Sequence, residues 1–391
     1  MKSLDNGLRS FLKDTFGTRV TFDEMERRVY GHDIASIPAM IKPFIGRTTT
    51  DTVVQPETAG ELSKLASRAR GHGVPLVPRG KATSGYGGAV PTRGGIVVDM
   101  RRMDKVLEVD RDAGVVRVQA GKTWQALDRA LAADGLTLRL YPSSYPSSTV
   151  GGWLAQGGAG FGSYQYGYFR DNVLAATVVL AGGEIREVSG SELDMYSEAE
   201  GITGLIADVS LKVQPLEDLE VVALGCDTPT RLQQLMTSLV ECPAPLWSVM
   251  FINPRMAEMK NLTPAPAGRG AEAEVVLPES YIVVVTFRAA DASEVRPALE
   301  DIASQAGARV LAGDIARQEW ENRFMIMQVK RLGPSLVPAE VVVPVAELGA
   351  VMSEVESKIK HPVLKEGIIV RRGKGGAPEA VLLGFIPADE R

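Results

Sequence analysis

The chain has 391 residues, of which 45% are hydrophobic and 23% charged, and its formal net charge is −5. This composition is ordinary for a globular protein of two or three domains. The negative charge argues against nucleic acid as the main partner, because phosphate binding requires a basic surface. No apolar run approaches the roughly 18 residues that span a membrane, so we expect no transmembrane segment. The N-terminus has no apolar signal core, and the expected location is the cytoplasm.

Cysteine and histidine are both sparse. The chain has two cysteines, Cys226 and Cys242, and three scattered histidines, His32, His72 and His361. An iron–sulfur cluster normally takes four cysteine thiolates, so this chain by itself cannot hold one. The histidines are not spaced as metal ligands, so we predict that no metal is bound and that each histidine is structural or faces solvent.

The first 215 residues alternate short β-branched runs with amphipathic helical patterns. Apolar residues recur at helical spacing near the N-terminus, which predicts an amphipathic surface helix over residues 4–12. Further helices are expected at Ala59–Gly71 and Trp124–Asp134, and strands at Thr52–Val54, Leu76–Val77, Ile96–Asp99, Val115–Gln119 and Val173–Leu180.

The pattern changes after Pro215. Glycine becomes rarer, and the expected order is strand, helix, strand, strand, helix, strand, followed by a weaker second cycle from Val341 to Phe385. The clearest elements are strands at Val221–Leu224 and Tyr281–Phe287 and helices at Arg231–Val240 and Val295–Gln305. The segment Pro264–Glu274 is rich in Pro, Gly and Ala and predicts an exposed loop. We therefore expect two domains, residues 1–216 and 217–391.

The first glycine-rich stretch runs from Val77 to Gly88 and follows an expected strand. Its glycines leave room beside the main chain, and successive backbone N–H groups in such a turn can bind an anion. Hydroxyl and cationic side chains at 79–84 suit a pyrophosphate. A Walker A loop is excluded because Tyr86-Gly87, not Lys-Ser/Thr, follows Gly85. The Gly-x-Gly-x-x-Gly spacing is also not met. By composition alone, a glycine-rich hairpin without a ligand remains equally acceptable.

The second stretch runs from Tyr141 to Gly167. Its glycines are dense between Gly151 and Gly160, and aromatic residues follow at 161, 164, 166 and 168. Small residues would let the backbone lie flat against a large planar ring. The alternative is a mobile surface loop, which the aromatic residues disfavour because such rings prefer a buried face.

Together these stretches resemble the FAD-binding domain of the FAD-linked oxidase family (vanillyl-alcohol oxidase or PCMH type), especially the flavin subunits of glycolate oxidase and D-lactate dehydrogenase. The resemblance covers residues 30–215 in order. It is carried by Pro78 through Thr83, Pro142 through Gly152, Tyr166-Gly167 and Glu200 through Ile206. It implies an α+β fold, in which a PCMH-type FAD-binding domain of two α+β subdomains is followed by a ferredoxin-like α+β cap domain.

The resemblance also implies which residues bind FAD. Residues 79–85 would wrap the pyrophosphate, 142–152 would follow the pyrophosphate and flavin, 155–160 would lie near the isoalloxazine, and 204 and 206 would contact the adenosine half. The implied set is Pro78, Arg79, Gly80, Lys81, Ala82, Thr83, Ser84, Gly85, Pro142, Ser143, Thr149, Val150, Gly151, Gly152, Ala155, Gly158, Gly160, Tyr166, Gly204 and Ile206. Family members that bind FAD covalently use a His or Cys in these loops. Neither occurs between residues 73 and 225, so FAD is expected to be non-covalent.

The cap region departs from the family pattern. Close members carry histidine motifs there that hold a divalent metal or act as the base, whereas the corresponding stretches here, Lys365–Val370 and Val381–Phe385, contain no histidine. The segment Trp320 to Arg323 does resemble the family's Trp-x-x-Arg, in which the arginine faces substrate. Arg323 and Lys330 are the candidate catalytic residues, and Lys330 and Arg331 follow at helical spacing from Arg323, so that the three could share one face. The alternative is a solvated basic face.

Two functional hypotheses remain open. The first is an FAD-dependent oxidoreductase, or one subunit of it, that oxidises a small carboxylate-bearing alcohol such as a 2-hydroxy acid. It would pass electrons to a separate iron–sulfur or other redox protein. The second is a flavin-carrying electron-transfer subunit with no substrate site of its own, which the missing histidines favour. A scaffold without a ligand is disfavoured by the intact FAD loops.

Overall fold

The computed structural model describes residues 4–35, 40–45, 48–264, 275–333 and 335–388. The chain divides into two compact units. Unit 1 comprises Met1–Gly158 and Phe169–Leu216, and unit 2 comprises Ala159–Tyr168 and Glu217–Arg391. The chain thus passes between units after Gly158, after Tyr168 and after Leu216. That the two units are a cofactor domain and a cap domain stays a prediction.

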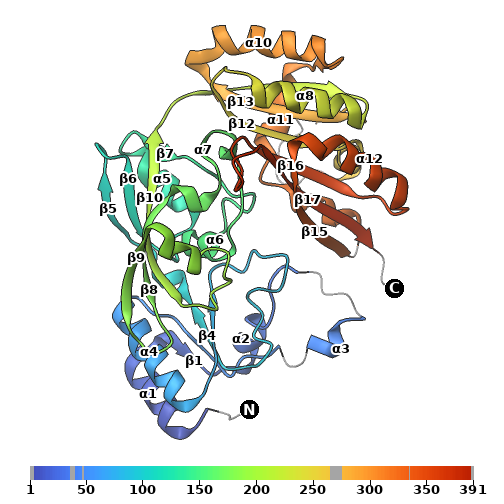
Figure 1. The fold of residues 1–391 in the computed structure, drawn as a ribbon. Helices are drawn as coiled ribbons and strands as arrows, with labels where there is room; N and C mark the ends of the chain where they lie inside the picture. Colours follow the sequence, from blue (N-terminus) through green and yellow to red (C-terminus); the bar gives the residue numbers. More distant parts are fainter. Residues whose placement is uncertain (1–3, 36–39, 46–47, 265–274, 334, 389–391) are drawn as a thin grey trace. The chain divides into compact units, whose positions relative to one another are not determined.

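Unit 1 contains two sheets, and the first has the strand order β1-β2-β4-β3. Strands β2, β4 and β3 are parallel, and β1 is antiparallel to β2. The helices α1 and α4 pack against each other (Figure 1). The strands are β1 (Val20–Thr21), β2 (Thr52–Val54), β3 (Leu76–Arg79) and β4 (Ile96–Asp99). The helices are α1 (Asn6–Phe16), α2 (Glu24–Val29), α3 (Lys42–Ile45) and α4 (Ala59–His72).

The second sheet of unit 1 is antiparallel, in the order β5-β6-β10-β8-β9, with β7 paired to β10. Its strands are β5 (Val106–Asp110), β6 (Val115–Gln119), β7 (Leu136–Leu138), β8 (Val173–Val179), β9 (Ile185–Ser189) and β10 (Leu205–Pro215). Helices α5 (Trp124–Ala132) and α6 (Val150–Gln156) belong to this part of the chain. Trp124, Trp153 and Phe169 pack ring against ring, with Trp153 and Phe169 stacked at a centroid distance of 4.2 Å.

Three helices of unit 1 begin where the sequence supplies a threonine cap. Thr58, Thr123 and Thr149 precede α4, α5 and α6, and each hydroxyl accepts a hydrogen bond from the backbone N–H three residues later. Such a cap satisfies an amide that the helix itself leaves unpaired. The apolar face of α4 is then buried through Leu62 and Leu65. These caps fix the starting points of α4, α5 and α6.

Unit 2 contains an antiparallel sheet in the order β14-β11-β13-β12-β16-β17-β15. Its first four strands have the 4-1-3-2 order of a ferredoxin-like core, and the other three extend it. The strands are β11 (Leu219–Cys226), β12 (Leu246–Ile252), β13 (Tyr281–Arg288), β14 (Arg309–Val310), β15 (Ser335–Pro344), β16 (Leu364–Val370) and β17 (Glu379–Ala388). The helices are α7 (Ser163–Tyr166), α8 (Pro229–Glu241), α9 (Pro254–Leu262), α10 (Ala292–Gln305), α11 (Gly313–Glu321) and α12 (Leu348–Lys358).

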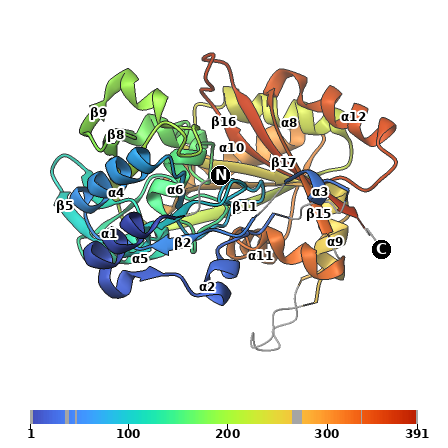
Figure 2. The same ribbon diagram turned by 90° about the horizontal axis from the view of Figure 1, so that it is seen from below.

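Helices cover both faces of this sheet. Figure 2 shows α8, α10 and α12 on one side and α9 and α11 on the other. The first side holds an apolar core in which residues of α8 such as Leu232 and Leu235 pack with Val249, Phe251 and Ile369 of the strands. The second side contains the charged residues described below.

Most of the predicted elements are present with small differences in length. The predicted order after Pro215 is found, with α9 as an additional helix between β12 and β13. The predicted N-terminal helix begins at Asn6 and buries Leu8, Leu12 and Phe16. Of the predicted loop Pro264–Glu274, residues 265–274 lie outside the described residues. In the described part of the chain, none of the helices has the length and apolar character needed to cross a membrane.

Candidate cofactor site

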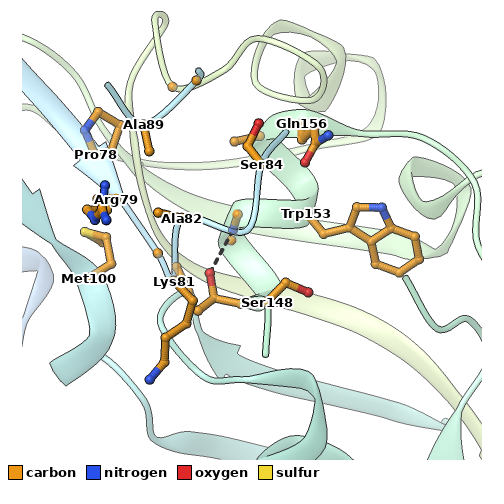
Figure 3. Close-up of a pocket in the computed structure, with 18 of the residues that line it drawn as sticks. Pro78, Arg79, Lys81, Ala82, Ser84, Ala89, Met100, Ser148, Trp153 and Gln156 are labelled. Carbon is orange, nitrogen blue, oxygen red and sulfur yellow. Dashed lines mark hydrogen bonds between the residues drawn. The ribbon is translucent and has the colours of Figure 1, made fainter. Parts of the chain in front are cut away.

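An open cavity lies within unit 1. Three separate stretches line it: residues 78–89 after β3, residues 144–156 leading into and along α6, and residues 200–206 at the start of β10. Figure 3 shows side chains from the first two stretches around the cavity.

The structure brings most of the predicted FAD residues together in this cavity. Those that line it are Pro78, Arg79, Gly80, Lys81, Ala82, Thr83, Ser84, Thr149, Gly151, Gly152, Ala155, Gly204 and Ile206. Those that do not are Gly85, Pro142, Ser143, Val150, Gly158, Gly160 and Tyr166. Val150 is in the core at the start of α6, and Gly160 and Tyr166 belong to unit 2. Their roles toward FAD stay predictions.

The cavity has further lining residues that the sequence did not single out for FAD. They are Gly88, Ala89, Met100, Ala120, Ser144, Ser148, Trp153, Gln156, Glu200 and Gly201. Several stand within the two glycine-rich stretches, so density of small residues was a usable signal. Met100 and Ala120 each follow directly on a strand, β4 or β6. Only the three-dimensional arrangement of the strand ends could identify these two.

The turn after β3 has the backbone geometry of an anion-binding nest. Ala82 adopts a left-handed conformation with φ of 52°, which few non-glycine residues take. Within the described residues, the backbone N–H groups of Lys81, Ala82, Thr83 and Ser84 have no hydrogen-bond acceptor. Successive free amides around a left-handed residue form a concave donor surface suited to phosphate oxygens. The turn therefore fits the pyrophosphate of a dinucleotide.

Gly80 is required where the turn approaches helix α6. A Cβ atom added at Gly80 would stand 2.3 Å from Oγ1 of Thr149. That hydroxyl caps α6 by accepting from the N–H of Gly152 at 3.3 Å. A Cβ at Gly151 would stand 2.5 Å from that of Ala120, so α6 also approaches the end of β6 closely. Missing side chains thus allow three backbone segments to meet at the cavity wall.

The three charged residues that line the cavity have different surroundings. Arg79 donates from Nη1 to the carbonyl of His32 at 2.9 Å, and burial lowers the pKa of its guanidinium. Lys81 is exposed. The exposed Glu200 also lines the cavity, and its pKa is raised by desolvation and by the nearby Asp33 carboxylate.

In unit 2, Arg323 lies among aromatic rings. Its guanidinium carbon is 3.7 Å from the Trp320 ring centroid, 4.3 Å from that of Phe324 and 6.0 Å from that of Phe161. Nη1 donates to the carbonyl of Trp320 at 2.5 Å. These distances are typical of cation–π contacts. The alternative of a solvated basic helix face therefore does not describe Arg323, and its role toward substrate stays a prediction.

The expected helix linking Arg323 to Lys330 and Arg331 is also wrong. Helix α11 ends at Glu321, and residues Ile326–Leu332 form a separate 3-10 helix. Lys330 and Arg331, seven and eight residues after Arg323, therefore do not share a face of one helix with it. Arg331 donates from Nη1 to the carbonyl of Pro264 at 3.0 Å. Lys330 is partly exposed on the 3-10 helix.

A buried charged cluster on the second side of the unit 2 sheet was missed. Nζ of Lys260 in α9 is 2.6 Å from Oε2 of Glu319 in α11, and both side chains are almost fully buried. Glu366 of β16 is 3% exposed. Desolvation, reinforced by Glu319 and opposed by Lys260, raises the pKa of Glu366 to about 7. The sequence did contain a sign of this cluster, because a lysine and a glutamate interrupt the otherwise apolar run 364–370.

No metal centre is recognisable in the part of the chain that the structure describes. Among those residues, no three His, Cys, Asp or Glu side chains form a group suited to hold a metal ion. His361 lies on the surface just before β16. Whether the protein binds metal remains for elemental analysis to test.

Comparison with known proteins identifies the type of cofactor. Residues 50–189 match the family model described as an FAD binding domain. The chain carries an FAD-binding domain. The matched range contains both glycine-rich stretches that line the cavity, so the FAD assigned from the sequence is confirmed as the cofactor type.

Curated relatives of the FAD-binding region include oxidoreductases. The glycolate oxidase subunit GlcD of Bacillus subtilis is 32% identical over 45% of this chain and 39% of its own length. The mitochondrial D-lactate dehydrogenase [cytochrome] of Arabidopsis thaliana is 30% identical over 68% of this chain and 48% of its own length. The matches span less than half of either relative.

Solved structures share the fold across both units. Alkyldihydroxyacetonephosphate synthase has a TM-score of 0.79 at 20% identity and covers 99% of this chain, with 81% of its own chain matched. The p-cresol methylhydroxylase structure has a TM-score of 0.78 at 13% identity, covering 99% of this chain and 84% of its own. The predicted α+β fold of PCMH type and the resemblance to the FAD-linked oxidases are confirmed.

Proposed function

We propose that the chain is an FAD-dependent oxidoreductase, or the flavin subunit of one, that oxidises a small carboxylate-bearing alcohol such as a 2-hydroxy acid. The observation that carries this proposal is the coincidence of the FAD-binding domain match, residues 50–189, with the cavity built by the two glycine-rich stretches. The relatives named above, a glycolate oxidase subunit and a D-lactate dehydrogenase, support this substrate class.

The chain's contribution to cofactor binding follows from the cavity. The amides of residues 81–84 would hold the pyrophosphate, the start of α6 would lie along the dinucleotide, and Gly204 and Ile206 would contact the adenosine half. When bound, FAD supplies a two-electron acceptor for the alcohol. No His or Cys stands between residues 73 and 225 to form a covalent link, so we propose that FAD is held non-covalently.

Arg323 is the proposed carboxylate-binding residue. A guanidinium is a planar fork of N–H donors that suits a carboxylate, and Arg323 donates from Nη1 to the Trp320 carbonyl. The Trp320 and Phe324 rings restrict its side chain, so less entropy would be lost on binding an anion. Lys330 is proposed as a second cation for the same substrate.

We propose a separate iron–sulfur or other redox protein as electron acceptor, and the cytoplasm as the location. The two cysteines of this chain are too few for a cluster, so electrons leaving FAD require another carrier. A transient complex of this kind would not require a large interface.

The second candidate is a flavin-carrying electron-transfer subunit with no substrate site. It is favoured by the composition of residues 217–391, whose single histidine, His361, is exposed. Alcohol oxidation profits from a base with a pKa near neutrality, and histidine is the usual choice. Under this hypothesis the aromatic setting of Arg323 only stabilises unit 2.

Anaerobic absorbance spectroscopy separates the two candidates. The flavin of the purified full chain is mixed with a panel of small 2-hydroxy acids, each in both enantiomers, and its bleaching is followed by stopped flow. Bleaching by one enantiomer supports the oxidoreductase. A flavin that dithionite reduces but that no panel member bleaches supports the electron-transfer subunit. A purified chain without flavin contradicts both.

A further inference from the structure

A buried carboxylate anchors the strand beside the turn at residues 80–84. Asp99 ends β4, and its side chain is completely buried. Oδ2 accepts hydrogen bonds from the Tyr30 hydroxyl at 2.8 Å and from Gln55 Nε2 at 2.9 Å, and Arg101 Nη2 donates to it at 2.6 Å. Burial opposes ionisation of Asp99, but the hydrogen bonds from Arg101 and Gln55 outweigh it and lower the pKa. The carboxylate is therefore a charged, fully paired anchor.

The hydroxyl of Tyr30 is held by two hydrogen bonds. Its hydroxyl donates to Asp99 and accepts from Arg101 Nη2 at 2.6 Å. Desolvation and the Asp99 charge raise the pKa of the phenol, so it stays protonated and remains a donor at neutral pH. With the hydroxyl held on two sides, the ring has a defined orientation.

Arg79 lies against this ring. Its guanidinium carbon is 5.2 Å from the centroid of Tyr30, within the range of a cation–π contact. Arg79 and Asp99 are partners in the parallel register of β3 and β4, so the anchored carboxylate and the arginine stand on adjacent strands. Arg79 lines the cavity, and Gly80, the first residue of the turn, follows it directly.

The guanidinium retains donors for a ligand. A guanidinium has five N–H groups. In the described structure Arg79 uses one of them, on Nη1, to donate to the His32 carbonyl. Burial lowers its pKa, which means that the cation has lost part of its hydration. A partly desolvated, pre-oriented cation interacts more strongly with an anion than a mobile one at the surface does.

We propose that Tyr30 is a positioning residue for the diphosphate of FAD. Its ring holds the Arg79 guanidinium at the edge of the turn, so that Arg79 and the amides of residues 81–84 meet the same pair of phosphates. This inference rests on the proposed function, because it takes FAD as the occupant of the cavity. Tyr30 itself need not touch the cofactor.

The test uses two substitutions at Tyr30 and a matched control. Tyr30→Leu removes the ring face, whereas Tyr30→Phe keeps it and removes the hydroxyl. Phe22→Leu removes another ring in unit 1 that has cations at 5.0 and 5.7 Å, Arg9 and Lys13, and does not line the cavity. Affinities of the flavin-free full chain for FAD and for riboflavin, which lacks phosphate, are measured by quenching of flavin fluorescence.

Tyr30→Leu is expected to weaken FAD binding about tenfold, as loss of a partly buried cation–π contact implies, and to leave riboflavin affinity unchanged. Tyr30→Phe should lose less FAD affinity than Tyr30→Leu, because the ring face remains while the hydroxyl that orients it is lost, and Phe22→Leu should lose none. Equal weakening toward both ligands, or no weakening, overturns the inference. So does a Tyr30→Phe variant as impaired as Tyr30→Leu.

A double-mutant cycle distinguishes an effect through Arg79 from a general loss of stability. In an Arg79→Met background, Tyr30→Leu should cause no additional loss of FAD affinity, because the residue through which it acts is gone. An additive second loss would show that Tyr30 acts through general stability and would overturn the inference. If Gly80→Val leaves FAD affinity at the wild-type value, the assignment of FAD to this cavity fails instead.

Discussion

At the scale of single residues, Gly80 offers the sharpest test of the cofactor site. Replacing it with valine places a Cβ 2.3 Å from Thr149 Oγ1, so that the turn or the capped start of α6 must move. We expect Gly80→Val to reduce flavin content to less than about a tenth of wild type, since both phosphate-binding elements are disturbed. Flavin absorbance per chain after gel filtration measures this.

The control is Gly71→Val, because a Cβ at Gly71 meets nothing within 4 Å. It introduces the same side chain in the same unit and should keep full flavin content. If both variants retain flavin equally, the turn at 80–84 does not bind the pyrophosphate.

Arg323 tests the substrate side. Arg323→Met removes the charge but keeps an unbranched stem among the rings of Trp320 and Phe324. Loss of a charge-assisted contact of about 1.5–3 kcal/mol should slow reduction of the flavin by the active 2-hydroxy acid roughly 10–150-fold. FAD content should not change. Stopped-flow absorbance gives the rate, and Arg331→Met, at a surface arginine paired with a carbonyl, is the matched control.

Residues predicted from a local pattern lie together in the structure. Glycines beside hydroxyl residues identified much of the cavity lining between Pro78 and Gly152. Residue-level prediction failed where partners are distant in sequence: the Arg323 environment depends on Phe161, far away along the chain. Likewise, the left-handed turn residue is Ala82, whereas the pattern pointed to the neighbouring glycines.

At the scale of elements, strand β16 contains an ionisable group in an apolar setting, and this predicts a pH-dependent stability. The pKa of Glu366 is raised to about 7 from a usual value of 4.5. Below pH 4.5 the group is protonated whether folded or unfolded. Between pH 4.5 and 7 the unfolded chain loses the proton while the folded chain keeps it, so stability falls as pH rises; above pH 7 the penalty is constant.

Glu366→Gln should therefore match wild type near pH 4 and be more stable at pH 8, by something on the order of 3 kcal/mol at ~1.4 kcal/mol per pKa unit. Calorimetric unfolding across this pH range measures the difference. Glu354→Gln is the control. Lys358 lowers the pKa of that exposed carboxyl, so this substitution should not stabilise the protein at pH 8 and should instead remove a favourable interaction there. A Glu366→Gln curve parallel to wild type at every pH would contradict the buried, uncharged glutamate.

The link between α9 and α11 gives a second test at this scale. Lys260→Met leaves Glu319 buried without its cation, and breaking a buried pair in this way typically costs about 3–5 kcal/mol. Lys358→Met breaks a solvent-exposed pair with Glu354 and should change stability little. Thermal unfolding compares the two variants. Equal, small effects would mean that the Lys260–Glu319 pair is not buried in solution.

Element boundaries were predictable where caps and breakers are local. Helix α4 was expected at Ala59–Gly71 and runs from Ala59 to His72, after the Thr58 cap. The end of α11 at Glu321 was not foreseen, since charged residues continue in the sequence beyond it. Helix periodicity alone cannot distinguish one long helix from an α-helix followed by a 3-10 segment.

At the scale of the whole molecule, the cofactor should leave the protein without breaking a covalent bond. Acid precipitation of the yellow protein should release FAD into the supernatant, because residues 73–225 contain no His or Cys. Absorbance of the supernatant and the pellet measures the partition. Flavin that remains in the pellet after washing and denaturation would contradict non-covalent binding.

The whole fold was accessible from sequence mainly through the ordered resemblance over residues 30–215. Composition and periodicity alone gave strands and helices but not their order in the sheets. The extension of the ferredoxin-like core by β16, β17 and β15 depends on pairing between segments distant in sequence, such as Ile252 with Glu366. Such pairings have no local signature.

The passage of residues 159–168 into unit 2 has a consequence for how the chain acquires its structure. During synthesis this segment emerges before Glu217, yet its partners come later: Tyr164 donates its hydroxyl to Leu239, and Tyr168 to Glu379. The side chains of Phe161, Tyr164 and Tyr168 therefore cannot reach all their partners until nearly the whole chain has been translated. We expect pairing between segments so distant in sequence to slow folding. The passage of residues 159–168 into unit 2 also means that a gene cut at residue 216 yields two fragments that are both incomplete.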